Sequence, residues 1–321
     1  MRLVFFSGWW LFGYLVLAGL ILSWIFGDQL VLTRYTGYLM PWLLLGLVPG
    51  ALWGLLAQQR ALAALLGISV VIIMAAYAPL FWPRKAVSVP GAMELKVLSY
   101  NVWSKNSHVD RMAHVVRTEQ PDLLLLQEIT PKVFERLKHS LQGLYEKQDL
   151  YYTYEPKFLL AVISRYPLAP KEITKGMGRV QKVVLASPDA GITVYNAHFV
   201  RRGGWQRRRL QIATLLQEDI VHKQGPVILG GDFNTTDQSQ TYGMLSKYLS
   251  NAHWQAGFGF GFTYPSPSLR VRGRIPLPAL ARIDHIFFND NLVAIQAGTL
   301  KDSGGSDHFP VGAILRLKPS P

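Results

Sequence analysis

The first 85 residues contain six charged side chains, and this constrains the fold of the chain more than any other feature. Between those charges lie three uncharged and largely apolar runs, at residues 3–27, 35–59 and 61–83. Each run is long enough to cross a bilayer, which requires about 20 apolar residues in a helix. The first run is too long for the apolar part of a secretory signal peptide. We therefore predict three transmembrane helices; the alternative is a set of buried helices in a soluble protein.

The basic residues that flank these runs give only a small positive-inside difference. Arg2 and Arg60 fall on one side of the membrane, and Arg34, Arg84 and Lys85 fall on the other. The tight connection AQQRA, which contains Arg60, is typical of a short cytoplasmic turn. This places the amino terminus inside and predicts a multi-pass protein of the bacterial inner membrane whose remaining residues are periplasmic. The absence of cysteine excludes disulfides and decides little about location.

The character of the sequence changes near residue 90, where short apolar runs begin to alternate with polar clusters. We predict a membrane anchor at 1–85, a linker at 86–93 and a soluble domain at 94–321. Within that domain the predicted strands lie in LKVLSYNVW, DLLLLQEI, FLLAVISRYPL, GITVYNAHFV, GPVILGGDFN, RIDHIFFND and FPVGAILRL. Helices are predicted in VDRMAHVVRTEQP and RRRLQIATLLQEDIVHK. Many strands with few helices favour an α/β fold in which two sheets pack face to face with helices outside.

Polar residues gather where these strands end. Taken singly, each has a structural interpretation, such as the cap of a turn. Together they supply carboxylates for a hard divalent cation, two imidazoles for proton transfer or hydrogen bonding, and amides that can hold a water or a phosphate oxygen. This combination is typical of a hydrolase. The residues are Asn101, Glu128, His198, Asp232, Asn234, Asp284, Asp307 and His308.

Seven segments resemble, in the same order, the endonuclease/exonuclease/phosphatase superfamily of metal-dependent phosphoesterases. They are LSYNVW, LLLLQEI, AVISRYPL, NAHFV, GGDFNTT, RIDHIFF and GSDHFPV, and they cover nearly all of residues 94–317. The resemblance implies a two-sheet, four-layer α/β sandwich with a catalytic cleft at one edge. The three apolar runs lie outside it.

The resemblance also implies a metal site. Glu128 matches the principal ligand, assisted by Asn101 and Asp307 either directly or through water. Mg²⁺ suits oxygen ligands of this kind because it keeps several waters that a substrate can displace. Mn²⁺ is the other divalent ion expected.

The remaining residues match the groups that act on the phosphate. His198 is similar to the family histidine that donates to a non-bridging phosphate oxygen, and Asn234 is similar to the amide beside it. His308 resembles the histidine that a carboxylate orients, here Asp284. Either His308 or Asp232 is the candidate general base for the attacking water, and the sequence leaves both open.

Two departures from the family pattern bear on the substrate. Trp103 stands where several nuclease branches have a polar or acidic residue, and KFLLAVISRYPL lacks the glycine often found before its Ser-Arg pair. With an aromatic residue at this place, the sequence resembles the sphingomyelinase-like branch of the family. This favours a lipid-type substrate over a polynucleotide.

The charge balance favours an anionic partner. The membrane region holds five basic residues and one acidic residue, which leaves a net charge of +9 on the rest of the chain. Arginines cluster in RRGGWQRRR and in RVRGR, and such clusters suit membrane lipids or nucleic acid. We expect a membrane-anchored phosphoesterase that hydrolyses an anionic, lipid-linked phosphate ester. The alternatives are a membrane-tethered nuclease that acts on DNA or RNA and a non-catalytic receptor for an anionic ligand. The oligomeric state stays open.

Overall fold

The computed structural model describes residues 2–82, 93–145, 150–171, 177–188, 190–201 and 204–318. The chain divides into two compact units, of which the first holds Met1–Trp82 and Thr236–Gly243 and the second holds Pro83–Thr235 and Met244–Pro321. Of the predicted linker 86–93, only Met93 lies within the described residues. The domain boundaries stay a prediction.

The first unit contains three long helices, namely α1 (Arg2–Phe26), α2 (Val31–Leu56) and α3 (Arg60–Tyr77). Two short 3-10 helices follow α1 and α3, namely η1 (Gly27–Gln29) and η2 (Ala78–Phe81). Pro41 and Pro49 lie inside α2. Three segments are long and apolar enough to span a membrane: Ser7–Gln29, Val31–Leu56 and Arg60–Phe81.

Small residues let these helices approach closely. A Cβ atom on Gly54 of α2 would lie 3.1 Å from the backbone nitrogen of Ala63 in α3, so glycine permits this crossing. Large apolar side chains point outward instead, and Leu56 is 80 % exposed. Close contacts through small residues and an apolar exterior are typical of helices packed in a bilayer.

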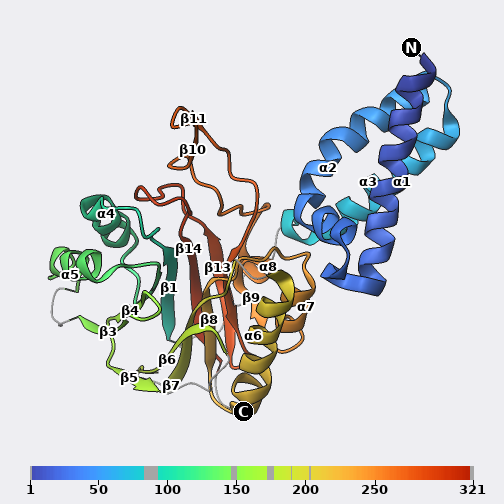
Figure 1. The fold of residues 1–321 in the computed structure, drawn as a ribbon. Helices are drawn as coiled ribbons and strands as arrows, with labels where there is room; N and C mark the ends of the chain where they lie inside the picture. Colours follow the sequence, from blue (N-terminus) through green and yellow to red (C-terminus); the bar gives the residue numbers. More distant parts are fainter. Residues whose placement is uncertain are drawn as a thin grey trace. The chain divides into compact units, whose positions relative to one another are not determined.

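The second unit contains two six-stranded mixed sheets (Figure 1). The first sheet has the strand order β13-β14-β1-β2-β4-β3. Its strands are β13 (Leu292–Thr299), β14 (Val311–Leu317), β1 (Glu94–Asn101), β2 (Leu123–Gln127), β4 (Leu160–Ser164) and β3 (Tyr151–Glu155). The second sheet has the order β5-β6-β7-β8-β12-β9. Its strands are β5 (Leu168–Lys171), β6 (Arg179–Ala186), β7 (Gly191–His198), β8 (Val227–Asp232), β12 (Asp284–Phe288) and β9 (Ser250–Asn251).

The two sheets share one apolar core. Leu123 and Leu125 of β2 belong to the same buried cluster as Val194 of β7 and Ile228 of β8. Strands β2 and β8 are buried along their whole length, which explains their continuous apolar sequences. Alternate residues of β2 face the other way, where Leu124 and Leu126 pack into a second cluster beneath helices.

The helices of this unit are α4 (Val109–Glu119), α5 (Pro131–Ser140), α6 (Gly204–Glu218) and α8 (Ala252–Ala256), with the 3-10 helix η3 (Ile220–His222). Helix α7 (Gln240–Leu245) begins in the segment assigned to the first unit. Met112 of α4 and Phe134 of α5 are buried in the second apolar cluster, on the outer face of the first sheet. Figure 1 shows α6 on the opposite side of the sandwich. The predicted α/β sandwich, preceded by three apolar helices, is confirmed.

One predicted strand is wrong in its detail. The segment FLLAVISRYPL was expected to form a single strand, but β4 ends at Ser164 in the first sheet and β5 begins at Leu168 in the second. Pro167 supplies a physical reason, because β4 lies between two other strands and proline has no backbone N–H to donate to a neighbouring strand. The chain therefore crosses from one sheet to the other here.

Candidate active site

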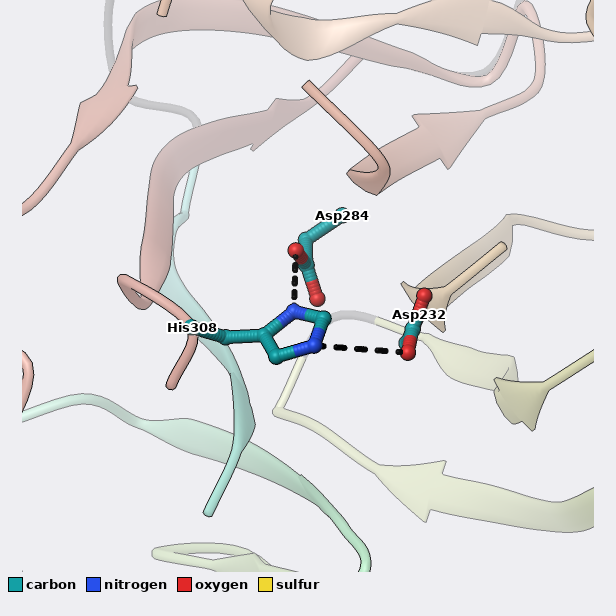
Figure 2. A group of neighbouring side chains, drawn as sticks. All are labelled: Asp232, Asp284 and His308. Carbon is teal, nitrogen blue, oxygen red and sulfur yellow. Dashed lines mark hydrogen bonds and ion pairs between the residues drawn. The ribbon is translucent and has the colours of Figure 1, made fainter. Parts of the chain in front are cut away.

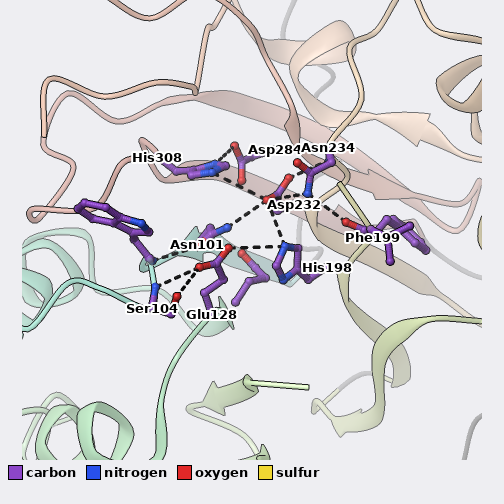
Figure 3. A network of polar contacts seen from close by, with 12 residues as sticks. Asn101, Ser104, Glu128, His198, Phe199, Asp232, Asn234, Asp284 and His308 are labelled. Atoms are coloured by element: carbon purple, nitrogen blue, oxygen red, sulfur yellow. Dashed lines mark hydrogen bonds and ion pairs between the residues drawn. The ribbon is translucent and has the colours of Figure 1, made fainter. Parts of the chain in front are cut away.

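The polar residues predicted from strand ends meet at one edge of the sandwich (Figure 3). Strands β1 and β2 are parallel, and so are β7 and β8, so the carboxyl ends within each pair lie together. Asn101 and His198 are the last residues of β1 and β7, and Asp232 is the last residue of β8. Strand β12 runs antiparallel to β8, which sets its first residue, Asp284, opposite Asp232.

The backbone at this edge adopts conformations that most side chains avoid. Glu128 and Asn234 have φ angles of +57° and +49°. Such angles are uncommon outside glycine and concentrate at functional sites. At Gly231, with φ at +148°, a Cβ atom would lie 1.8 Å from the carbonyl oxygen of Ala197. Only glycine therefore lets β8 lie this close to β7, which brings His198 and Asp232 into register.

Asp232 is the centre of the hydrogen-bond network. Its Oδ2 accepts from Asn101 Nδ2 at 3.0 Å and from Asn234 Nδ2 at 3.2 Å, and its Oδ1 accepts from the Asn234 backbone at 2.8 Å. The same Oδ2 lies 3.6 Å from His198 Nε2 and 3.9 Å from His308 Nε2. The side chain is 2 % exposed. Several donors thus fix one buried carboxylate with an oxygen directed at two imidazoles.

Asn234 differs from its expected role in one respect. Its side-chain nitrogen donates to the Phe199 carbonyl oxygen at 3.0 Å as well as to Asp232. These two bonds use both amide hydrogens. In this conformation Asn234 fixes Asp232, and neither of its amide hydrogens is left to donate to a phosphate oxygen.

His308 and Asp284 form the expected pair (Figure 2). His308 Nδ1 donates to Asp284 Oδ2 across 2.8 Å, which leaves Nε2 directed at Asp232. The Thr263 hydroxyl oxygen accepts from the Asp284 backbone at 3.3 Å and so helps to set the carboxylate. The Tyr264 ring lies 4.8 Å from the His308 ring, centroid to centroid. Asp284 and Tyr264 therefore hold the imidazole in one orientation.

Glu128 lies on the opposite side of the site from His308 and Asp284 (Figure 3). Its Oε2 accepts from the Ser104 backbone at 3.1 Å and from the Ser104 hydroxyl at 2.9 Å. Its Oε1 lies 3.7 Å from His198 Nε2. Burial alone would raise the pKa of Glu128, but the hydrogen bonds from Ser104 and the charge of His198 outweigh it and lower the pKa. The carboxylate is therefore ionised at neutral pH, as a metal ligand must be.

Three other groups have shifted pKa values. Burial lowers the pKa of His308, but the charges of Asp284 and Asp232 dominate and raise it to about 10. Burial raises the pKa of Asp232, and the nearby Asp284 adds to this while His308 opposes it. Burial raises the pKa of Asp307 to about 6, aided by the charges of Glu128 and Asp232. Several carboxyl groups therefore lie close enough at this edge to raise one another's pKa.

The donor set fits a divalent cation. Asp307 Oδ1 is buried and has no hydrogen-bond partner among the described residues, and its pKa responds to the charge of Glu128. A buried carboxylate oxygen that has no hydrogen-bond partner and lies near a second carboxylate can be satisfied by binding a hard cation. Asn101 Oδ1, Glu128 and Asp307 therefore suit Mg²⁺ or Mn²⁺.

A second group of potential ligands has another explanation. Ligand atoms of Asp232, Asp284 and His308 lie within 4.8 Å of one another. The Nδ1 of His308 already donates to Asp284, and its Nε2 faces Asp232 Oδ2 at 3.9 Å, so both ring nitrogens are directed at carboxylates. Polar contacts within the protein therefore account for this grouping.

Two residues near the candidate metal ligands tie the loop before β14 to the sheet. The buried Ser306 hydroxyl donates to the Asn101 carbonyl oxygen at 2.6 Å and accepts from the His308 backbone at 3.1 Å. Ser306 therefore sets the position of its neighbours and is not a nucleophile. The Asp307 carbonyl oxygen accepts from the Ser266 backbone at 2.7 Å.

The first arginine cluster is only partly exposed. Arg207 and Arg209 of α6 are exposed, whereas Arg208 is 4 % exposed and donates to the Val200 carbonyl oxygen. Successive helix residues point about 100° apart, so three neighbouring arginines cannot share one face. Arg201, just after β7, lies over the Tyr264 ring at 5.6 Å from its centroid. Arg202 lies outside the described residues.

Three functional positions were missing from the sequence prediction. Ser104 binds Glu128, Thr263 sets Asp284, and Tyr264 packs on His308. A hydroxyl three residues after Asn101, in the same polar loop, was an available signal for Ser104. For Thr263 and Tyr264 the sequence did not identify the partners, because these lie 21 and 44 residues away along the chain.

Solved structures share this fold. An endonuclease/exonuclease/phosphatase from Bacteroides vulgatus is 18 % identical with a TM-score of 0.55, covering 70 % of this chain and 100 % of that one. A humanized D. rerio TDP2 is 16 % identical with a TM-score of 0.54, covering 69 % and 98 %. A mannosyl-6-phosphatase from Bacteroides thetaiotaomicron is 18 % identical with a TM-score of 0.52, covering 69 % and 99 %. At these identities the likeness establishes the fold.

Sequence comparison identifies the family as well as the fold. No curated protein gives a significant match. The sequence model of the Endonuclease/Exonuclease/phosphatase family matches residues 98–308, which begin in β1 and end at His308. The match takes in more than half of the chain and includes the strand ends that build the network around Asp232. The chain therefore belongs to the Endonuclease/Exonuclease/phosphatase family.

Proposed function

We propose that the protein is a divalent-metal-dependent phosphoesterase that cleaves a phosphate ester by in-line attack of water. The observation that carries this proposal is the convergence on one buried carboxylate, Asp232, of two imidazoles and two amides, beside an ionised Glu128. In-line displacement at phosphorus adds charge to the phosphoryl oxygens and needs a base for water, and this set supplies both functions.

Asp232 is the proposed general base. A histidine with a pKa of about 10 already carries both ring protons at neutral pH, so His308 cannot accept another. It can donate from Nε2 to the phosphoryl oxygens or to the leaving group. Asp232 Oδ2 lies within 4 Å of both imidazole Nε2 atoms, which fixes the position of the oxygen that accepts the proton. Burial and the nearby Asp284 raise the pKa of Asp232 and so make it a stronger base. Asp284 orients His308 and balances its charge.

Asn101, Glu128 and Asp307 are the proposed metal ligands. A bound Mg²⁺ or Mn²⁺ supplies Lewis-acid stabilisation of the phosphoryl oxygens. His198, whose Nε2 faces Glu128 Oε1 and Asp232 Oδ2, is the proposed donor to a non-bridging oxygen. Asn234 holds Asp232 and is proposed as a positioning residue.

The proposed substrate is a lipid-linked phosphate ester. Residues 1–85 are proposed as the membrane anchor and 94–321 as the catalytic domain, with 86–93 between them. Three segments of the anchor can span a bilayer. A short tether to a bilayer presents lipid phosphates at high effective concentration. The net positive charge of the catalytic domain also favours an anionic surface.

Substrate preference provides the direct test. In Mg²⁺, the detergent-purified full chain is expected to hydrolyse a phosphorylated lipid in mixed vesicles faster than single- or double-stranded DNA at equal phosphate concentration. The measurement compares released product for each substrate with the wild type and with Asp232→Ala, which reports contaminating activity. Faster cleavage of DNA would replace the lipid proposal with the nuclease alternative, which the family membership also permits.

The receptor alternative has no specific observation in its favour. A binding module that had lost catalysis would have no need of a buried carboxylate aimed at two histidines. Hydrolysis of any phosphate ester that depends on Asp232 would exclude it.

The proposed location is the bacterial inner membrane, with the catalytic domain in the periplasm. The amino terminus is placed in the cytoplasm because Arg60, the first residue of α3, directly follows the tight turn between α2 and α3. A periplasm-active reporter fused after residue 321 is expected to be active, and a cytoplasm-active reporter at the same place is expected to be silent. The opposite pattern would put the domain in the cytoplasm. Fusions after residue 58, in the turn, provide the internal control and are expected to give the reverse result.

A further inference from the structure

A β-hairpin extends beyond the sandwich between α8 and β12 (Figure 1). It consists of β10 (Arg270–Val271) and β11 (Ile275–Pro276), which pair with each other and with neither large sheet. Its turn is tight, because Arg274 donates from its backbone to the Val271 carbonyl oxygen at 3.1 Å and both Arg272 and Gly273 have positive φ. An isolated two-stranded hairpin is marginally stable in water, so its exposed position calls for an explanation.

The hairpin combines aliphatic and cationic side chains without any acidic residue. Val271 and Ile275 are directly paired across the strands, so their side chains lie on the same face. They are 43 % and 65 % exposed. Arg270, Arg272 and Arg274 are exposed beside this pair, and no aspartate or glutamate occurs between residues 266 and 283. The hairpin thus presents an uncovered aliphatic pair flanked by positive charge.

The base of the hairpin is attached to the proposed active site. Ser266 donates from its backbone to the Asp307 carbonyl oxygen at 2.7 Å and from its hydroxyl to the Ser306 carbonyl oxygen. Ser268 and Ser303 hydroxyls lie 3.3 Å apart. Two residues before Ser266, Tyr264 packs on the His308 ring. The hairpin is therefore an extension of the wall that holds His308 and Asp307.

We infer that residues 269–277 form a membrane-contact hairpin that inserts Val271 and Ile275 into the headgroup region of an anionic bilayer. Aliphatic side chains gain by leaving water at that depth, while arginines bind the lipid phosphates around them. Nucleic acid is the less suitable partner, because single strands are bound by stacking on aromatic rings and this tip has none. The inference rests on the anchoring part of the proposed function and is independent of the phosphoesterase chemistry.

The full chain contains no cysteine, so a single introduced thiol labels one chosen position. Val271→Cys, labelled with an environment-sensitive dye, is reconstituted as the full chain into vesicles of phosphatidylglycerol and phosphatidylcholine. Val221→Cys is the matched control, because this valine of η3 is 44 % exposed and lies outside the hairpin. Lipid-borne spin labels are expected to quench the dye at 271 and to leave the dye at 221 largely unaffected.

Charge removal tests the arginines separately. In the labelled Val271→Cys chain, Arg272→Gln with Arg274→Gln is expected to lower the ratio of quenched to unquenched dye about 30-fold, because each interfacial basic residue contributes roughly a factor of five. Lys132→Gln with Arg136→Gln removes two exposed charges from α5 and is expected to leave that ratio unchanged. Hydrolysis of a small soluble phosphodiester is expected to be the same in all these variants.

Flotation of the protein with the vesicles separates the possible failures. If the protein floats and the dye at 271 is quenched no more than the dye at 221, the hairpin inference is wrong and the membrane-anchor proposal is supported. If the protein does not float, both the membrane-anchor proposal and the hairpin inference are wrong. If single-stranded DNA, but not lipid, shifts the emission at 271, the hairpin contacts nucleic acid and the membrane assignment is overturned.

Discussion

Replacing Asp232 with alanine is expected to lower turnover at least ~10²-fold, the usual contribution of a positioned general base. The reason lies in its position: it accepts from two amides, faces two imidazoles and is buried, so a water that enters the structure has no equivalent orientation or basicity. The measurement is the initial rate of hydrolysis of a soluble phosphodiester in Mg²⁺, with the full chain in detergent.

Two comparisons make this result specific to the carboxylate. Asp232→Asn keeps the size of the side chain and is expected to be as inactive as Asp232→Ala, because the amide cannot accept the proton from water. Asp290→Asn removes an exposed carboxylate from the turn between β12 and β13 and is expected to retain full activity. Circular dichroism and melting temperature check the fold of each variant. A folded Asp232→Asn protein with wild-type turnover would refute the assignment of the base.

Removing divalent metal is expected to reduce hydrolysis to background, with recovery on adding Mg²⁺ or Mn²⁺. Glu128, Asn101 and Asp307 gather oxygen atoms at a place where Asp307 Oδ1 has no hydrogen-bond partner among the described residues. Without a cation, the charges of Glu128 and Asp307 oppose each other and leave no Lewis acid for the phosphate. The measurement is the rate in excess chelator and after stepwise addition of metal.

Binding is measured independently of the rate. A ligand that binds only the folded state raises stability, by about 2.7 kcal/mol at a hundredfold excess over its dissociation constant, so Mg²⁺ is expected to raise the melting temperature. Glu128→Gln is expected to reduce that rise and to require more metal for activity. Glu135→Gln, an exposed residue of α5, is the control and is expected to behave as the wild type. Full activity in chelator would exclude the metal-dependent mechanism.

Much of the fold and of the candidate site was visible in the sequence because buried strands leave a local pattern. Runs such as 123–126 and 227–229 are apolar because both faces of β2 and β8 are covered, and the polar residues at the ends of these strands mark one edge of the sandwich. The helix of α4 was visible for the same kind of reason, since its buried residues recur at helical spacing. Strand ends therefore predicted which residues meet.

What the sequence did not reveal depends on contacts between distant segments. The burial of Arg208 results from the rotation of α6 against the residues after β7, which a run of three arginines does not disclose. The Thr263 hydroxyl oxygen accepts from the Asp284 backbone, and this contact joins a loop to a strand that begins 21 residues later. The crossing between β4 and β5 had a local signal in Pro167, but the continuous apolar run before it suggested a single strand.

The division of the candidate active site between the two sheets has a further consequence. Asn101 belongs to the first sheet and Glu128 directly follows one of its strands, whereas His198, Asp232 and Asp284 belong to the second. Neither sheet holds a set that could bind a metal and activate water by itself. The candidate site is therefore complete only when the apolar interface between the two sheets has closed, so the proposed hydrolysis requires the whole sandwich to be folded.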